Sequence, residues 1–256
     1  MQTKYKVTVN LKGGLGNQLF QILAGYNYAK VHGKEFFIDY NNKFHASQGN
    51  TPSTYKNNLF QNIPENKIDS SFNLYNEPSF EYNEIPFMDG NVILEGYFQS
   101  DYYFDKDDLD IISFSSLKSK IEQIDDFIDD DTVGIHVRGG DYKIYSKHNI
   151  INQQYYKDSI GLFKNSKLYA VTDDKNYANQ LLPGEVKIID GGNEIGDFLF
   201  LTRCKNLIIS NSTLSWFASY FNKKDIIVAP SRWFNDNTNT EGLYRKEFKI
   251  ITVWQI

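Results

Sequence analysis

Arg138 is the side chain in this sequence whose chemistry best suits a phosphate ligand. It directly follows a short apolar run, Val133–Val137, and precedes Gly139 and Gly140. A guanidinium is planar and permanently charged, so it can hold two phosphate oxygens, and glycines let a ligand approach the backbone closely. The segment therefore predicts a phosphate or diphosphate site, although a plain ion pair between Arg138 and Asp141 is also compatible with it.

Three further polar clusters follow other predicted strands. Asn211, Ser212 and Thr213 precede a predicted helix, whose first backbone N–H groups and positive dipole end favour an anion. Asp173 and Asp174 follow another apolar run and could accept hydrogen bonds from a guanine edge or a ribose hydroxyl. The third cluster is a glycine-rich turn between a predicted strand and a predicted helix, with Gly13, Gly14, Gly16 and Asn17.

Each cluster alone has a simpler structural explanation. Ser212–Thr213 and Asp173–Asp174 stand where helix caps are expected, and glycine-rich turns between strands and helices are common. The two aspartates are adjacent, so they also lack the spacing of an Asp-x-Asp metal site. The combination carries the functional interpretation, because every cluster falls at the carboxyl end of a predicted strand, where open parallel sheets bind ligands.

The hydrophobic pattern predicts an α/β chain with parallel sheets. Apolar residues alternate over 5–11 as in a strand, and a helical apolar period follows over 15–31. Apolar runs and amphipathic stretches then alternate through the second half, which predicts helices on both faces of a buried sheet. Further predicted strands are 35–39, 92–94, 133–137, 168–171, 186–189, 207–210 and 226–228, and further predicted helices are 152–164, 174–182, 194–204 and 214–221.

An acidic run, Asp125–Asp131, precedes the first strand of this regular half. It predicts an N-terminal domain over 1–130 and a C-terminal domain over 131–256, with the four clusters converging on a cleft between them. Residues 41–89 lack a clear period, so we expect loops and short helices there, and an acceptor is expected to be selected by this stretch. Most of its aromatic residues are expected in the core: Phe44, His45, Tyr55, Phe60, Phe72 and Tyr75.

Composition excludes several classes of protein. The net charge of the 256-residue chain is −5 without a basic tail, which argues against nucleic acid as a partner. Neither a signal-peptide core nor an apolar run of about 18 residues is visible, so we expect a cytoplasmic chain without a membrane span. Peripheral association with a membrane remains open. The single cysteine, Cys204, excludes a disulfide framework within the chain.

Several motifs together resemble the α-1,2-fucosyltransferases of glycosyltransferase family 11, in their bacterial form. The turn Gly13–Gln21 resembles the opening motif of the family, and His136–Tyr142 resembles its His-x-Arg-Arg-Gly-Asp-Tyr motif. Val171–Asp174 and Cys204–Phe217 are similar to two further segments, and Gly96–Ser100 is also familiar. The matches run in the family's order through nearly the whole chain.

The resemblance implies a B-type glycosyltransferase fold, with two Rossmann-like domains facing across a cleft. It implies GDP-fucose as donor substrate, no cofactor, no catalytic metal, and inverting transfer to the 2-hydroxyl of a terminal galactoside. The acceptor would be a galactose-terminated oligosaccharide or lipid-linked glycan, as in bacterial surface polysaccharide or O-antigen synthesis. By position, Arg138 would bind the β-phosphate. The other implied site residues are His136 and Asp141 near the reaction, Asp173 and Asp174 at the nucleotide, Asn211, Ser212 and Thr213 at the phosphates, and Gly14, Gly16 and Asn17 on the N-terminal side of the cleft.

One departure from the motif concerns charge. Gly139 stands where relatives have a second arginine. If this loss of charge only weakens donor binding, Gly139→Arg should lower the donor KM. An unchanged or higher donor KM would instead indicate that the pocket is reshaped around the glycine.

The sequence leaves the general base and the exact activity open. Glu95, Asp101 and Asp141 are candidate bases by position, and a dissociative reaction would need no strong base. The alternatives to fucosyl transfer are a transferase of the same fold with another GDP-sugar or acceptor, and a nucleotide-sugar-binding protein without catalysis.

Overall fold

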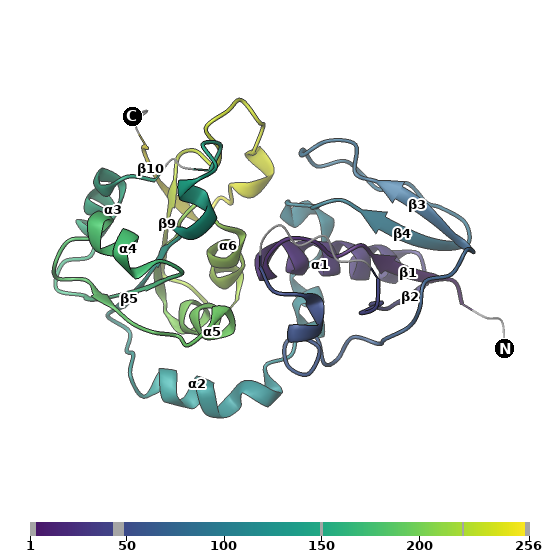
Figure 1. The fold of residues 1–256 in the computed structure, drawn as a ribbon, viewed down its shortest axis with the longest axis horizontal. Helices are drawn as coiled ribbons and strands as arrows, with labels where there is room; N and C mark the ends of the chain where they lie inside the picture. Colours follow the sequence, from purple (N-terminus) through teal and green to yellow (C-terminus); the bar gives the residue numbers. More distant parts are fainter. Residues whose placement is uncertain (1–3, 43–48, 149–150, 222, 254–256) are drawn as a thin grey trace. The chain divides into compact units, whose positions relative to one another are not determined.

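The computed structural model describes residues 4–42, 49–148, 151–221 and 223–253. The chain divides into two units (Figure 1). The N-terminal unit comprises Met1–Leu117 and Asn239–Leu243, and the C-terminal unit comprises Lys118–Thr238 and Tyr244–Ile256. Each unit contains one sheet, and all the strand pairs in both sheets are parallel.

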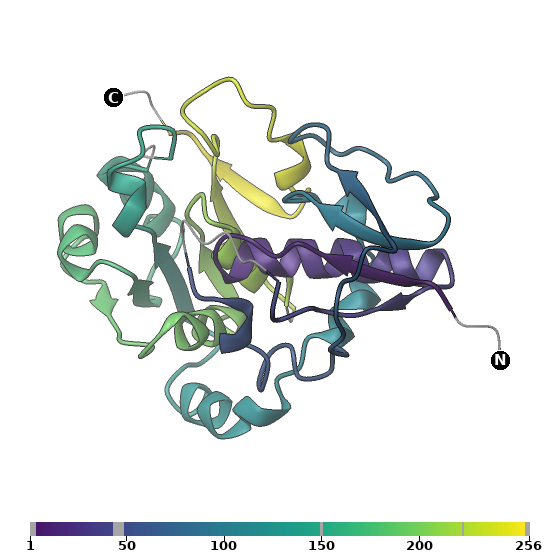
Figure 2. The same cartoon turned by 45° about the vertical axis from the view of Figure 1, so that its right-hand side comes forward.

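The sheet of the N-terminal unit has the strand order β2-β1-β4-β3. Its strands are β1 (Lys6–Val9), β2 (Glu35–Phe36), β3 (Phe72–Asn76) and β4 (Asn91–Glu95). The helix α1 (Leu15–Val31) runs beside these strands in both ribbon views (Figures 1 and 2). Short 3-10 turns complete the unit: η1 (Pro52–Thr54), η2 (Asp101–Tyr103), η3 (Lys106–Ile111), η4 (Ser115–Leu117) and η6 (Glu241–Leu243).

The expectation of only loops and short helices over 41–89 is wrong for β3. This strand pairs with β4 over five residues, from Phe72↔Asn91 to Asn76↔Glu95. It is an edge strand without a fully buried residue, so its sequence shows neither an apolar run nor a clean alternation. Tyr55 and Phe60 are completely buried, as expected of core aromatics, whereas Phe44 and His45 lie outside the described residues.

The C-terminal sheet has the strand order β7-β6-β5-β8-β9-β10. Its strands are β5 (Thr132–Val137), β6 (Lys167–Thr172), β7 (Lys187–Ile188), β8 (Asn206–Ile208), β9 (Ile226–Pro230) and β10 (Phe248–Ile251). Chain order reverses direction between β5 and β8, as in the dinucleotide-binding Rossmann fold, and the crevice beyond that point is where such sheets bind ligands.

Helices cover both faces of the C-terminal sheet. They are α3 (Gln153–Ile160), α4 (Lys175–Leu181), α5 (Glu194–Arg203) and α6 (Thr213–Tyr220). The helix α2 (Lys118–Asp125) packs against α5, and the 3-10 turn η5 spans Gly140–Lys143. Every residue of β5 is buried. Val133, Ile135 and Val137 pack with α3 and α4 side chains in one core cluster, whereas Gly134 on the other face meets Cys204 after α5. The sheet is therefore buried on both sides, as its apolar strands predicted.

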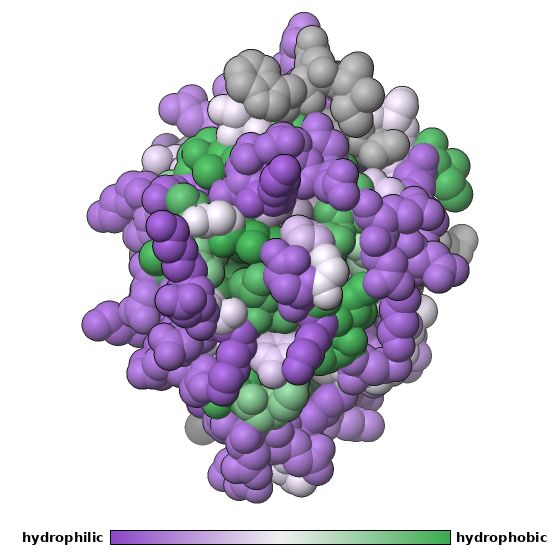
Figure 3. All heavy atoms as spheres, turned by 90° about the vertical axis from the view of Figure 1, so that its left-hand side faces the viewer, coloured by the Kyte–Doolittle hydropathy of each residue, from purple (hydrophilic) through white to green (hydrophobic). Residues whose placement is uncertain are grey.

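The surface is largely polar around this core. In Figure 3, apolar side chains gather near the middle of one face and polar side chains border them. Within the described residues, the structure has no helix with both the length and the apolar character that a membrane crossing requires.

Candidate active site

Arg138 is held at the end of β5 by the carboxylate of Asp173, which follows the neighbouring strand β6. The two side chains form an ion pair with an N–O distance of 2.8 Å, and both are partly exposed. The second oxygen of Asp173 accepts the Gly139 N–H at 2.7 Å. Register explains the pairing, because Val137 lies opposite Thr172 and the next residue on each strand is Arg138 or Asp173.

Asp174 is the N-cap residue of α4, as expected if this residue caps a helix. Its carboxylate accepts the Tyr177 N–H at 2.9 Å and pairs with Lys143. The Lys143 hydrogen bond holds the pKa of Asp174 below its usual value. Asp173 and Asp174 thus both have protein partners, and their predicted contacts to a nucleotide remain predictions.

His136 lies beneath the edge of the sheet, with 3 % of its surface exposed. Its Nδ1 is 2.9 Å from the Ser210 hydroxyl, and its carbonyl accepts the Tyr156 hydroxyl at 3.0 Å. Burial, and secondly the charge of Arg138, lower the pKa of His136 to about 3. The imidazole is therefore neutral in the physiological range, and its contacts join β5 to the segment after β8. The side chain of Asp141 lies outside the described part of the structure.

The segment after β8 faces Arg138 across the point where strand order reverses. Asn211 is buried, and its amide donates to the carbonyls of His148 at 3.0 Å and Trp233 at 2.9 Å. Ser212 is the N-cap residue of α6, but its hydroxyl makes no capping hydrogen bond. The cap therefore leaves the first-turn N–H groups of α6, from Thr213 onward, in the orientation that suits an anion.

A stack of rings, absent from the predicted site, supports this edge. Tyr142 donates to the Asn211 carbonyl at 3.2 Å and stacks on His148 with ring centroids 4.7 Å apart. The Arg138 guanidinium lies 5.4 Å from the Tyr142 ring centre, in cation–π range. The ring of Tyr142 thus links Arg138 to the segment before α6.

Asp197 on α5 is a second group that the sequence reasoning missed. Burial, and secondly the charge of Asp190, raise the pKa of Asp197 to about 7, while a hydrogen bond from the Gly191 N–H opposes this shift. Asp173 also contributes to the raised pKa, which places the two carboxyls in the same electrostatic neighbourhood. A partly buried carboxyl with a perturbed pKa near other charged groups is a frequent mark of a functional site.

The predicted residues Gly14, Gly16 and Asn17 lie in the N-terminal unit, at the start of α1. Gly14 is the N-cap of this helix, and a side chain on Gly49 would meet the Gly14 Cα at 2.4 Å, so the backbone of Gly49 lies very close to this turn. Asn17 accepts the Gln99 amide at 2.8 Å. That bond joins the turn after β1 to the loop after β4, where strand order reverses in this sheet.

Lys12, Glu95 and Tyr97 form a charged and aromatic cluster at the same edge. Lys12 pairs with Glu95 at 2.6 Å, and its ammonium lies 4.8 Å from the Tyr97 ring centre. The side chain of Gln21 accepts the Lys12 N–H at 2.9 Å and donates to the Lys12 carbonyl at 3.2 Å. The lysine is thus fixed by its backbone as well as by its charge.

Glu77 holds the loop that carries Tyr97. Its carboxylate accepts the backbone N–H groups of Tyr97 at 2.7 Å and Phe98 at 3.0 Å, and burial raises the pKa of Glu77. Phe98 has a φ of 51°, which is strained for a non-glycine residue. Backbone strain of this kind concentrates at functional sites.

Among the described residues, no three His, Cys, Asp or Glu side chains are grouped so that they could hold a metal ion.

Comparison with known proteins assigns the family. The profile of glycosyl transferase family 11 matches residues 1–252. The chain belongs to glycosyl transferase family 11. The α-1,2-colitosyltransferase of Escherichia coli is 27 % identical over 89 % of this chain and 92 % of its own length. The O-antigen biosynthesis glycosyltransferase WbnK of Escherichia coli is 23 % identical over 90 % of this chain and 96 % of its own length.

Two solved structures show that this family 11 chain has the B-type fold. The fucosyltransferase NodZ from Bradyrhizobium aligns with a TM-score of 0.57 and 14 % identity over 85 % of this chain and 93 % of NodZ. POFUT1 in complex with GDP aligns with a TM-score of 0.51 and 10 % identity over 90 % and 98 % of the two chains. The chain is therefore a glycosyltransferase of family 11 with the expected fold.

Gly139 lies where a second arginine would collide with α4. A Cβ on this residue would be 2.7 Å from the Asp174 Cβ and 3.0 Å from the Tyr177 Cδ1. We therefore expect Gly139→Arg to raise the donor KM at least about fivefold, because overpacking displaces Asp174 and the Asp173 bond to the Gly139 N–H. Donor titrations of both proteins measure this, with Gly184→Arg as control, since a side chain at Gly184 meets open space. A lower KM for Gly139→Arg would mean that the missing charge matters more than the crowding.

The raised pKa of Asp197 makes stability depend on pH. The unfolded chain loses this proton near the usual pKa of 3.8, whereas the native state keeps it until about 7, so native stability is lost as the pH rises through that window. As the pH rises from about 5 to about 8, the unfolding free energy of Asp197→Asn should increase relative to that of wild type by about 1–2 kcal/mol. Urea unfolding at both pH values measures the difference, with Asp107→Asn as an exposed control. If the unfolding free energies of wild type and Asp197→Asn change equally between the two pH values, the raised pKa of Asp197 is contradicted.

Proposed function

We propose that this family 11 enzyme transfers fucose from GDP-fucose to the 2-hydroxyl of a terminal galactoside, with inversion, in the synthesis of a bacterial surface polysaccharide. The observation that carries the donor half of the proposal is the arrangement at the reversal point of the C-terminal sheet. Arg138 follows β5, and the first turn of α6 follows its neighbour β8. A guanidinium and a helix N-terminus on adjacent strand ends form an anion site at the place where such sheets bind nucleotides.

The reaction needs such an anion site. As the bond between the fucose C1 and the phosphate oxygen breaks, negative charge grows on the β-phosphate and the sugar becomes oxocarbenium-like. Donors that are already oriented toward this phosphate stabilise the transition state more than the ground state. In our proposal, Arg138 supplies the charge and the α6 N–H groups supply further hydrogen bonds.

The ion pair with Asp173 prepares Arg138 for this role. It uses one edge of the guanidinium, at NH1, and Asp173 is itself fixed by the Gly139 N–H. The side chain is thus oriented before the donor binds, which lowers the entropic cost of binding. Asp197 is the carboxyl in this neighbourhood that we assign to the nucleobase, because it can accept two N–H groups of a guanine edge once it has lost its proton.

For the acceptor, we assign the cluster of Lys12, Glu95 and Tyr97. A carboxylate accepts hydrogen bonds from sugar hydroxyls, and an aromatic ring contacts the apolar face of a sugar. The Tyr97 ring is 37 % exposed, and Glu95 is partly exposed beside its lysine. Glu95 was also one of the three candidate bases, and it lies at the reversal point of the N-terminal sheet.

The comparisons support this donor class and add a second candidate. NodZ has been studied with GDP-fucose and aligns with a TM-score of 0.56, and POFUT1 with GDP aligns at 0.51. The relative at 27 % identity is an α-1,2-colitosyltransferase, which favours nucleotide-linked colitose as the alternative donor for the same linkage.

The assay offers the purified protein GDP-fucose, GDP-colitose and other GDP-sugars in turn, with lactose and a panel of galactosides. We measure GDP release and determine the linkage in the product by NMR. A fucosylated product with an α-1,2 linkage supports the proposal, and a product from colitose alone supports the second candidate. Donor binding without product across the whole panel would reject transfer in favour of a binding protein.

Removal of Arg138 tests the donor half. Arg138→Ala should lower kcat/KM about 10²–10³-fold, the usual effect of deleting one oriented donor at a developing charge. The kcat/KM of Arg138→Lys should lie between the values of wild type and Arg138→Ala, because lysine keeps the charge but loses the planar fork. Arg203→Ala is the matched control, since it removes an arginine from an exposed ion pair with Asp125. Circular dichroism checks the fold, and near-normal turnover in Arg138→Ala would end this part of the proposal.

Substitution of Glu95 tests the acceptor half. Glu95→Gln should raise the acceptor KM about tenfold through the loss of a charged hydrogen-bond acceptor, while the donor KM stays close to wild type. If Glu95 is also the base, kcat falls as well and its dependence on pH changes. Glu247→Gln, a change in the Arg245–Glu247 pair of the C-terminal unit, is the control. An unchanged acceptor KM in Glu95→Gln would mean that residues other than Glu95 bind the acceptor.

A further inference from the structure

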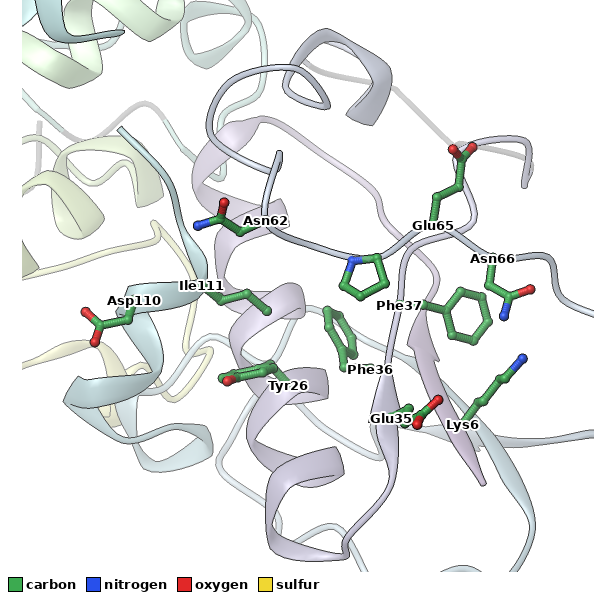
Figure 4. Close-up of a pocket in the computed structure, with 11 residues that line it drawn as sticks. Lys6, Tyr26, Glu35, Phe36, Phe37, Asn62, Glu65, Asn66, Asp110 and Ile111 are labelled. Atoms are coloured by element: carbon green, nitrogen blue, oxygen red, sulfur yellow. The ribbon is translucent and has the colours of Figure 1, made fainter. Parts of the chain in front are cut away.

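A cavity of about 480 Å³ opens along the edge of the N-terminal sheet, beside β2 (Figure 4). Lys6 and Glu35, the first residues of β1 and β2, line it. Asn17, in the first turn of α1, and Glu95, the last residue of β4, lie at the opposite, carboxyl ends of the strands. The cavity is therefore separate from the cluster assigned above to the acceptor.

Aromatic rings form its apolar walls. Tyr26 of α1 and Phe36 of β2 meet edge to face with ring centroids 6.2 Å apart, and Figure 4 shows both among the side chains that line the cavity. Phe37 points to the opposite face of the strand, where its ring packs edge to face on Phe72 with ring centroids 5.8 Å apart. Because neighbouring strand residues alternate between faces, the cavity extends around the strand edge.

The strand edge itself offers a donor and an acceptor. Glu35 and Phe37 use their N–H groups on β1, so the N–H and C=O of Phe36 point away from the sheet. Neither group is bonded to another of the described residues. A peptide strand cannot extend along this edge, because the next outward groups, those of Ile38, already pair with Pro64 and Asn66.

The rim is polar and carries an excess of negative charge. Asn62 and Asn66 supply amides, and the charged lining residues are three carboxylates, Glu35, Glu65 and Asp110, and the ammonium of Lys6. Glu65 pairs with Lys56 at 2.6 Å, which leaves Glu35 and Asp110 against Lys6. This balance disfavours a phosphate, a nucleotide or an acidic lipid headgroup. Amides and carboxylates beside aromatic rings instead match a ligand that has hydroxyl groups and apolar C–H faces.

We propose that this cavity is a second carbohydrate-binding site, which takes about two units of a neutral oligosaccharide. The volume lies within the range of small-ligand pockets. Sugar hydroxyls can both donate to and accept from the backbone of Phe36, and the C–H faces fit the rings of Tyr26 and Phe36. The site would hold part of a glycan away from the reacting end, and it does not depend on the identity of the donor.

Side-chain amide signals in proton–nitrogen NMR spectra test the proposal. We titrate the protein with a neutral tetrasaccharide built on lactose, and separately with sialyllactose, which carries a carboxylate. The amide signals of Asn62 and Asn66 should shift with the neutral sugar at millimolar concentrations and shift less with the anionic one. Unmoved amide signals, or a preference for the anionic sugar, would overturn the proposal.

A pair of double variants provides the control. Asn62→Ala with Asp110→Ala removes two rim groups, and binding measured on the Asn66 amide signal should weaken about tenfold. Asn57→Ala with Asp107→Ala makes the same changes at exposed positions outside the cavity and should bind as wild type does. Transfer to a disaccharide should be unchanged in both. Equal sugar affinity in the two double variants would reject the cavity as the binding site. A wild-type protein that binds the sugar but shows no transfer would contradict only the proposed function.

Discussion

The ion pair between Arg138 and Asp173 is the interaction on which the candidate donor site depends. It joins the ends of two neighbouring strands and, through the Gly139 N–H, also fixes the turn that follows β5. Beneath it, neutral His136 bonds Ser210 and so connects β5 itself to the segment before α6. Both sides of the reversal point are thus tied to β5, so the charge and the helix N-terminus keep a fixed relation within this unit.

The N-terminal sheet uses the same arrangement with different residues. Lys12 follows β1 and Glu95 ends β4, the two strands at its reversal point, and they also pair across neighbouring strand ends. Gln21 and Glu77 fix the two partners' loops through backbone hydrogen bonds. A parallel sheet brings the residues that follow its strands to one edge, and in both units oppositely charged residues there hold each other in place.

Much of this architecture could be predicted from sequence because the strands are buried on both faces. Continuous apolar runs identify β5, β6 and β8, and α1 follows from its period, so the site residues were assigned to the correct strand ends. The edge strand β3 was missed because exposed Asn73 and Asn76 interrupt its pattern. Asp197 was missed because its raised pKa comes from burial and from the charges of Asp190 and Asp173. The sequence shows neither this burial nor the approach of these carboxylates.

Gly139 illustrates the limit of reasoning from motifs. As a sequence feature, it is a missing charge. In the structure it is a consequence of how soon α4 begins, because Asp174 caps the helix immediately after Asp173 has bonded Gly139. The cap places Asp174 and Tyr177 over the glycine, where a Cβ has no room. A second arginine would therefore require a different start of α4, and with it a different position for Asp173. The single arginine and the early helix start are two aspects of one packing arrangement, while the strand register places the Asp173 carboxylate beside Arg138.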